Sequence, residues 1–232
     1  MDLEKYKSTI GVERLISFSN GVEDIAEDFL LKMYELNIKT SQSLYPALSI
    51  VEIHLRNAID TMLQTLFSKT WLEDEIKTQK LLYDYDFEKL QKAYKTLQSK
   101  YGEENITHGK LISELTFGFW VNLCSKKYNP KIWTKKGAFR GVFIDYPKDR
   151  QEKIHEISVK LNKIKKLRNR IFHYEPILYK KDKFGVIYNI ICELITYLPK
   201  DGSGIFERTN NFPYDLTEML QELNIIPNNK KP

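Results

Sequence analysis

Apolar residues recur every three or four positions along most of this chain, and no segment alternates apolar and polar residues with the period of two expected for a half-buried strand. Glycine and proline, which would interrupt long helices, number only 10 and 8 among the 232 residues. Helices with such stripes bury them against one another. The sequence therefore predicts an all-α fold, a bundle of about five to seven helices.

The predicted helices are bounded by polar residues, glycine or proline. A first helix over 22–38 follows a break at residues 20–21, and Ser41 or Ser43 caps a second that runs to Leu66 with Pro46 in its first turns. Further helices are expected at 87–101, 110–128 (apolar on most sides and so in the core), 136–144, 147–173 and 184–198, with a short one at 214–223. This length favours a single domain over 1–232, with its core at about 20–200 and a C-terminal extension at 201–232.

Positive charge is concentrated in one segment. Between Arg150 and Lys183 there are eleven Lys/Arg and four Asp/Glu, a net charge of +7, whereas the whole chain carries +5 and the other 198 residues together carry −2. A localised positive field suits a polyanion such as nucleic acid. The alternative interpretation of any single lysine there is a solvent-exposed helix face.

The cysteine pattern and the terminal segments exclude several classes of protein. Cys124 and Cys192 lie in apolar surroundings without the spacing of a zinc site, so we expect reduced core residues, no metal and no cofactor. The first residues lack an apolar leader, and the longest apolar tract, 186–198, is interrupted by Asn189 and Glu193. These features predict a cytoplasmic protein with no membrane contact.

The basic helix carries three side chains suited to phosphodiester chemistry, namely Arg168, Asn169 and His173. An imidazole can give or take a proton near neutral pH, and a guanidinium can bind a phosphate. At about 100° per residue, however, Arg168 and His173 point roughly 140° apart. Both can reach one phosphate only if Pro176 distorts the helix end or a second chain supplies one of them. An ordinary helix-end histidine is the alternative interpretation.

Other residues are expected to support this group. Arg168 lies within the apolar stripe of its helix and needs a carboxylate partner, for which Glu52 is the best candidate, unless it extends past Leu167 to water. The surrounding cations would hold an RNA backbone by charge; they are Lys160, Lys163, Lys165, Lys166 and Arg170.

Three blocks of sequence resemble a known family. Arg168-Asn169-x3-His173, followed by Tyr174-Glu175-Pro176, resembles the Arg-x4-6-His signature of HEPN proteins, specifically the abortive-infection family of the AbiD/AbiF kind. The second block is residues 48–59, which include Glu52 and Leu55-Arg56-Asn57. The third is residues 112–120, which contain Phe117, Phe119 and Trp120. One departure is Tyr174, which stands where relatives often carry a second histidine.

The resemblance implies a HEPN-like helical bundle with additional helices that forms a homodimer around a shared cleft. It also implies a metal-independent endoribonuclease in which the ribose 2′-hydroxyl attacks the phosphate, acting in phage defence or as a toxin, with a noncoding RNA as a possible regulator. His173 would be the general acid/base, Arg168 would stabilise phosphate charge, and Asn169 would orient His173 or contact the backbone. Glu52 would steady Arg168, with Arg56 and Asn57 in support.

Two other functions fit the residues themselves. A non-catalytic RNA-binding module would use the same basic helix to hold a regulatory RNA. A helical adaptor would dimerise and bind a protein partner without affinity for nucleic acid.

Overall fold

In a computed structural model, residues 8–19, 26–151, 153–178, 181–199 and 203–212 are described. Every regular element among them is a helix and none is a strand, which confirms the predicted all-α class. Ten α-helical segments, α2 to α11, exceed the predicted number because several are only five to eight residues long. No helix in these ranges is long and apolar enough to cross a membrane.

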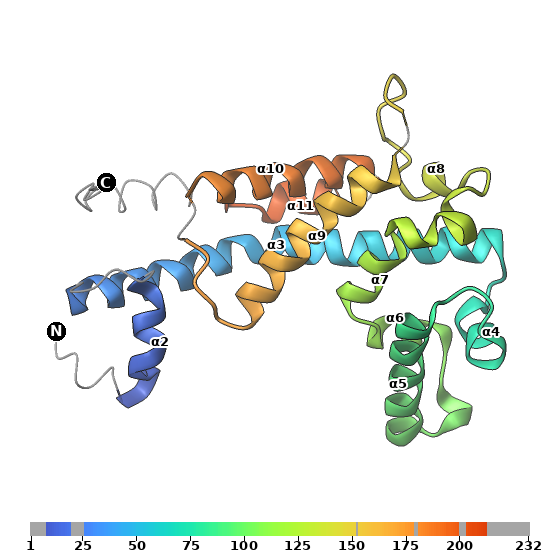
Figure 1. The fold of residues 1–232 in the computed structure, drawn as a ribbon, viewed down its shortest axis with the longest axis horizontal. Coiled ribbons are helices and arrows are strands. Elements are labelled where there is room, and N and C mark those ends of the chain that lie inside the picture. The colour runs from blue at the N-terminus through green and yellow to red at the C-terminus, as the bar shows by residue number, and fades with distance from the viewer. Residues whose placement is uncertain (1–7, 20–25, 152, 179–180, 200–202, 213–232) are drawn as a thin grey trace.

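The longest element, α3 (Glu27–Leu66), spans 40 residues and forms the axis on which the other helices pack (Figure 1). The sequence pattern predicted two helices here, with a break near residues 39–43, and that break is absent. The predicted start at residue 22 lies outside the described residues.

Hydroxyl side chains explain why α3 continues through the expected break. Thr40 and Ser41 do not cap a new helix; they donate to the carbonyls four residues earlier, at 2.7 Å each, and Ser43 does the same at 3.1 Å. Pro46 removes one backbone donor inside the helix, a loss that ordinarily favours a kink. Leu44 is nonetheless fully buried, and burial of this face keeps the segment helical.

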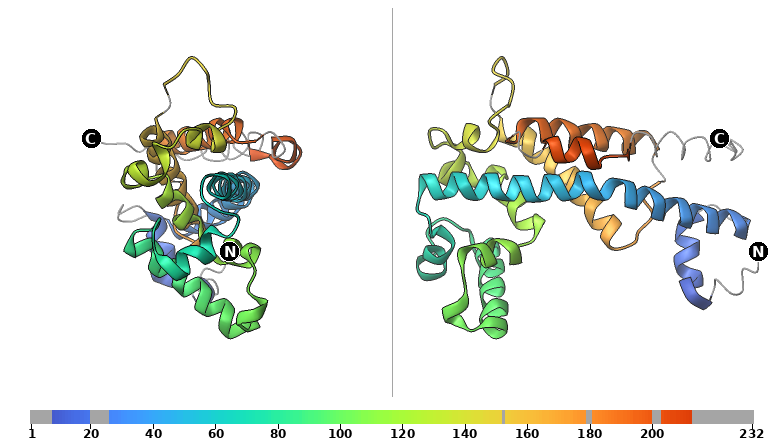
Figure 2. Two further views of the ribbon diagram at one scale, coloured as in Figure 1. Left: turned by 90° about the vertical axis from the view of Figure 1, so that its right-hand side faces the viewer. Right: turned by 180° about the vertical axis from the view of Figure 1, so that it is seen from behind.

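At its C-terminal end α3 leads into a lobe of short helices (Figures 1 and 2). The lobe comprises α4 (Trp71–Thr78), α5 (Asp84–Tyr101) and α6 (His108–Glu114). Helix α5 matches the prediction and ends at Gly102, whose φ of 80° suits glycine.

The apolar segment 110–128 is not one helix, as predicted, but α6, α7 (Phe117–Leu123) and a 3-10 turn at Lys126–Tyr128. Leu115 adopts an extended conformation and ends α6, while Thr116 begins α7. A single helix this apolar would expose one of its faces, whereas the bend lets side chains from both halves enter the core. Phe119 and Trp120 are completely buried there, as the pattern predicted.

The remaining helices pack directly against α3. They are α2 (Val12–Ile16), α8 (Ala138–Val142), α9 (Ile154–Phe172), α10 (Lys181–Tyr197) and α11 (Ser203–Thr209). Helix α9 begins seven residues later than predicted. Helix α11 was predicted as loop, and the nearby Phe212 is fully buried against Tyr188, with 4.3 Å between ring centroids. The helix predicted at 214–223 lies outside the described residues.

A histidine joins three helices at the base of the lobe. His108, the first residue of α6, contacts Asp60 of α3 through Nε2 at 2.9 Å and Glu73 of α4 through Nδ1 at 2.8 Å. Asp60 also accepts a hydrogen bond from the Trp71 indole at 2.8 Å. Partial burial alone would lower the pKa of His108, but the hydrogen bonds to Glu73 and Asp60 outweigh it, so the pKa lies above 6.5.

This cluster predicts a pH-dependent stability. Because the folded state binds the proton of His108 more tightly than the unfolded chain, the stabilisation is complete below about pH 6.5 and is lost as the pH rises through the higher folded-state pKa. We expect His108→Gln to lower the free energy of unfolding by about 1 kcal/mol at pH 6 and by less at pH 9. Urea unfolding at both pH values measures this, with the exposed His155→Gln as control; an equal loss at both would contradict it.

Candidate functional site

Helix α9 ends in a tight turn directly after the residues of the predicted site. His173 is the C-cap, and the next residue, Tyr174, adopts a left-handed conformation with φ of 57°. The amide of Tyr174 donates to the Ile171 carbonyl at 3.0 Å and that of Glu175 to the Arg170 carbonyl at 2.8 Å. This pair of bonds is a Schellman motif, here built without glycine. The helix therefore stays regular up to the site, and no distortion brings Arg168 and His173 together.

Side chains from distant parts of the chain hold this turn in place. Arg14 donates to the Tyr174 carbonyl at 2.8 Å, and the buried Asn37 donates to the Glu175 carbonyl at 3.3 Å and accepts from the Ile177 amide at 2.8 Å. A bulky residue in the left-handed region costs about 1–3 kcal/mol, so such contacts are needed to maintain it. These contacts therefore hold the backbone next to His173 in place.

Arg168 pairs with Glu52, as the helix phases predicted. Its Nε lies 3.3 Å from Glu52 Oε2, and both side chains are a little over one quarter exposed. The guanidinium also lies over the Phe172 ring, 4.2 Å from its centroid. Only Nε is used by Glu52, and the two terminal nitrogens hydrogen bond to none of the described residues. Arg168 is therefore anchored yet still able to donate to a phosphate.

His173 and Asn169 are both exposed. The His173 amide donates to the Asn169 carbonyl at 2.9 Å, but within the described part of the chain neither side chain has a hydrogen-bond partner. The predicted orienting contact from the Asn169 side chain to His173 is not made. Arg168 points toward Glu52 of α3, whereas His173 faces solvent about 7.5 Å further along the helix axis.

The predicted RNA-binding cations fall into two groups. Lys160 is paired with Glu193 at 2.5 Å, and Arg170 is paired with Glu175 at 3.3 Å and also donates to the Pro176 carbonyl. Their charges are therefore largely neutralised within the chain. The other three have no carboxylate partner among the described residues; they are Lys163, Lys165 and Lys166.

Arg56 and Asn57 do not contact Arg168. Arg56 Nε lies 3.3 Å from Asn57 Oδ1, one turn beyond Glu52 on α3. Both residues lie on α3, as Glu52 does, but their side chains interact with each other. The predicted support of Arg168 by Arg56 and Asn57 is therefore not made by direct contact.

Several apolar side chains on the segments that carry Arg168 and Glu52 are exposed. Phe172, which lies against Arg168, is 44% exposed, Tyr174 71%, Ile53 41% and Tyr45, two turns before Glu52 on α3, 59%. Single exposed apolar residues are common, but several on neighbouring segments are typical of an interface.

Sequence reasoning missed the residues that fix this site from elsewhere, Arg14 and Asn37, and a group of tyrosines and lysines in the lobe. In the latter, Lys89 Nζ lies 4.1 Å from the Tyr85 ring centroid; Lys131, from the helical turn Asn129–Trp133, places its Nζ 4.2 Å from the ring centroid of Tyr83. The four-residue spacing of Tyr85 and Lys89 would have been a signal, but the helix predicted from the sequence began at residue 87 and left Tyr85 outside it.

Comparison of the chain with protein-family models, curated proteins and solved structures finds no match. Within the described ranges, no group of three His, Cys, Asp or Glu side chains is arranged to hold a metal ion.

Proposed function

We propose that this protein is a metal-independent endoribonuclease with a HEPN-like helical bundle, active as a homodimer whose two α9 helices meet at a shared cleft. The proposal extends to a cytoplasmic role in phage defence or toxin-like growth arrest, with RNA as substrate and a noncoding RNA as a regulatory partner. The resemblance of residues 168–173 to the HEPN signature motivates it.

The observation that carries the proposal is the Arg168–Glu52 pair, together with the exposed His173 five residues later on the same helix. Glu52 holds the guanidinium through Nε alone, at 3.3 Å, so the terminal nitrogens remain available for two phosphate oxygens. The imidazole of His173 is exposed on a backbone that Arg14 and Asn37 hold firmly. One group is suited to bind charge and the other to transfer a proton.

The proposed reaction needs no group beyond these side chains and RNA. His173 removes the proton of a ribose 2′-hydroxyl, the oxygen attacks the adjacent phosphorus, and the bond from phosphorus to the 5′-oxygen breaks. The same His173, now protonated, returns the proton to that 5′-oxygen. The products are a 2′,3′-cyclic phosphate and a 5′-hydroxyl, and Arg168 stabilises the negative charge on the phosphoryl oxygens during the step.

Dimerisation is proposed because one chain directs Arg168 and His173 to different sides. A twofold axis near Phe172 would bring Arg168 of one protomer toward His173 of its partner. It would also cover the exposed apolar side chains of Ile53, Phe172 and Tyr174.

The direct test is cleavage of end-labelled RNA by the purified protein in excess chelator. We expect 2′,3′-cyclic phosphate ends, identified because they resist alkaline phosphatase until mild acid has opened the ring to a monoester. Cleavage that appears only when a divalent metal is added would overturn the mechanism.

A mixing experiment tests the shared cleft. Arg168→Ala and His173→Ala are each expected to be inactive, but mixed protomers that exchange should regain about a quarter of the activity, because half of the dimers are mixed and each has one complete site. Cleavage rates before and after mixing measure this. Absence of recovery, with exchange confirmed by labelled protomers, would show that each site is built by one chain.

A second candidate function is non-catalytic RNA binding. It is favoured by the exposed Lys163 and Lys166 and the partly buried Lys165, which lack carboxylate partners among the described residues, and by an imidazole that no described side chain orients. This function predicts salt-dependent binding without cleavage. A protein-binding adaptor would show no RNA affinity at physiological salt.

A further inference from the structure

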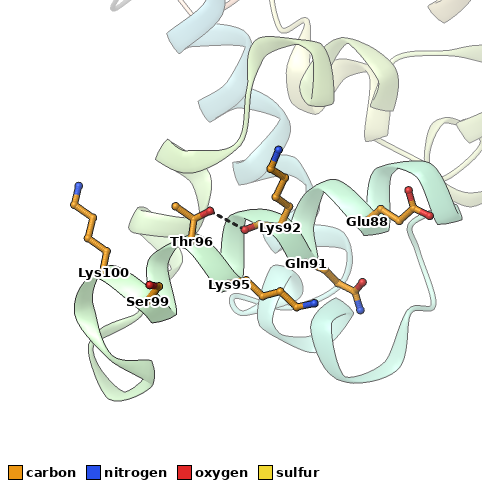
Figure 3. Close-up of a pocket in the computed structure, with 7 residues that line it drawn as sticks. All are labelled: Glu88, Gln91, Lys92, Lys95, Thr96, Ser99 and Lys100. Carbon is orange, nitrogen blue, oxygen red and sulfur yellow. Dashed lines mark hydrogen bonds between the residues drawn. The ribbon is translucent and has the colours of Figure 1, made fainter.

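The outer face of α5 carries a row of positive charge. At about 100° per residue, Tyr85, Lys89, Lys92 and Lys100 fall within an arc of roughly 80°. Figure 3 shows Lys92, Lys95 and Lys100 extending from a shallow groove along this helix. We call Tyr85, Lys89, Lys92, Lys95 and Lys100 the α5 stripe.

The positive charge of the α5 stripe is not neutralised within the chain. None of its lysines forms an ion pair with a described residue, and Glu88 is the one carboxylate among the residues lining the groove. Lys127 differs, because its Nζ forms an ion pair with the buried Asp86 at 2.6 Å. A row of unpaired cations is suited to a polyanion.

Tyrosine rings accompany the lysines at both ends of α5. Tyr85 is 59% exposed, with Lys89 Nζ 4.1 Å from its ring centroid. At the other end Tyr101, 41% exposed, lies between Lys100 and Lys110, at 5.0 and 4.4 Å. Exposed aromatic rings among cations are typical of surfaces that bind single-stranded nucleic acid by stacking and charge together.

Lys165 connects the α5 stripe to the candidate active site. It lies against α7, where its Cδ is 3.8 Å from the position that a Cβ would take on Gly118. Helix α7 packs against both α5 and α9, so it links the helix of the stripe to the helix of Lys165. The pKa of Lys165 is lowered, first by partial burial and then by the charge of Lys89. In Figure 1, α5 and the C-terminal end of α9 lie on the same side of α3.

We propose that the α5 stripe and Lys165 bind a single strand of RNA, with phosphates along the lysines and a base stacked on Tyr85. The 18 residues of α5 extend about 27 Å, which accommodates a tract of at least about four nucleotides. This inference deepens the proposed function, on which it rests for the identity of the ligand, by assigning the path along which RNA approaches α9.

The test is binding of a fluorescent twelve-nucleotide oligouridine to the full-length His173→Ala protein, measured by anisotropy at several salt concentrations. We expect the triple variant Lys89→Gln, Lys92→Gln, Lys95→Gln to bind at least tenfold more weakly and to lower the salt slope by about 2, since each lost phosphate contact contributes about 0.7. The matched control replaces three exposed lysines outside α5 with glutamine; they are Lys69, Lys136 and Lys148.

Substitutions of Tyr85 separate stacking from charge. Tyr85→Ala should weaken binding at least about fivefold with an unchanged salt slope, whereas Tyr85→Phe should bind as well as the parent because stacking does not need the hydroxyl. Equal binding by the triple variant and the control, or no binding by the parent, would overturn the inference. So would a triple variant that loses affinity for phosphatidylserine vesicles but not for RNA.

The outcomes also separate this inference from the proposed function. Stripe-dependent binding by a protein that never cleaves RNA would refute the ribonuclease and leave the inference standing. If the wild-type protein cleaves RNA and the triple substitution changes neither the cleavage rate nor the affinity for RNA, the inference is refuted and the ribonuclease proposal stands.

Discussion

His173→Ala is expected to lower the rate of RNA cleavage by about a hundredfold to ten-thousandfold, the contribution that a positioned acid or base ordinarily makes. The imidazole is exposed and hydrogen bonds to no described residue, so its removal should leave the fold intact. Single-turnover cleavage of labelled RNA in chelator measures the rate, and thermal unfolding checks the fold.

His155→Ala is the matched control. His155 is also exposed on α9, but it lies eighteen residues before His173 and thus about 27 Å away along the helix axis. We expect the control to retain the wild-type rate. If both variants cleave at the same rate, His173 has no role in proton transfer and the alternative of a non-catalytic RNA-binding module becomes the better proposal.

Asp86→Ala is expected to reduce the free energy of unfolding by about 2–4 kcal/mol, whatever the function. The carboxylate is completely buried and accepts from Tyr128 at 2.8 Å, Lys127 at 2.6 Å and Asn122 at 3.0 Å. Its loss leaves the buried Tyr128 hydroxyl and the Asn122 amide without this partner, while the half-exposed Lys127 can turn to water.

The control for this prediction is Asp84→Ala, two residues earlier in α5. Asp84 is exposed and accepts one hydrogen bond, from Gln79 at 2.8 Å, so its loss should cost well under about 1 kcal/mol. Urea unfolding of both variants measures the difference. Equal destabilisation would show that the network around Asp86 contributes nothing beyond ordinary helix-end effects.

The boundaries of the helices show which predictions from sequence succeed. Helix α5 was predicted well because its apolar stripe and the terminating Gly102 lie within one short window. The break predicted near Ser41 was wrong because a serine can cap a helix or bond back to the preceding turn, and local sequence does not distinguish the two. Burial of the neighbouring Leu44 against other helices decides the outcome.

The candidate site was predictable to a similar extent. Helix phase alone suggested that Arg168 turns inward and needs a carboxylate, and Glu52 is the partner found 116 positions away. The clamps on the turn after His173 were not predictable, because Arg14 and Asn37 lie 160 and 138 positions from the carbonyls they bind. No local pattern encodes contacts over such separations.

The sequence by itself determined that the chain is helical, since helix hydrogen bonds and apolar stripes are local. It also singled out residues 168–173 as the candidate site. Only the three-dimensional structure decided which cations remain unpaired. Neutralisation of Lys160 needs Glu193 from another helix, and that of Arg170 needs the turn that returns Glu175 beside it. The structure likewise decided that α9 stays regular up to His173, because the distant Arg14 and Asn37 hold the turn that follows. The divergence of Arg168 and His173 that helix phase predicted is therefore kept, since no distortion of the helix end removes it.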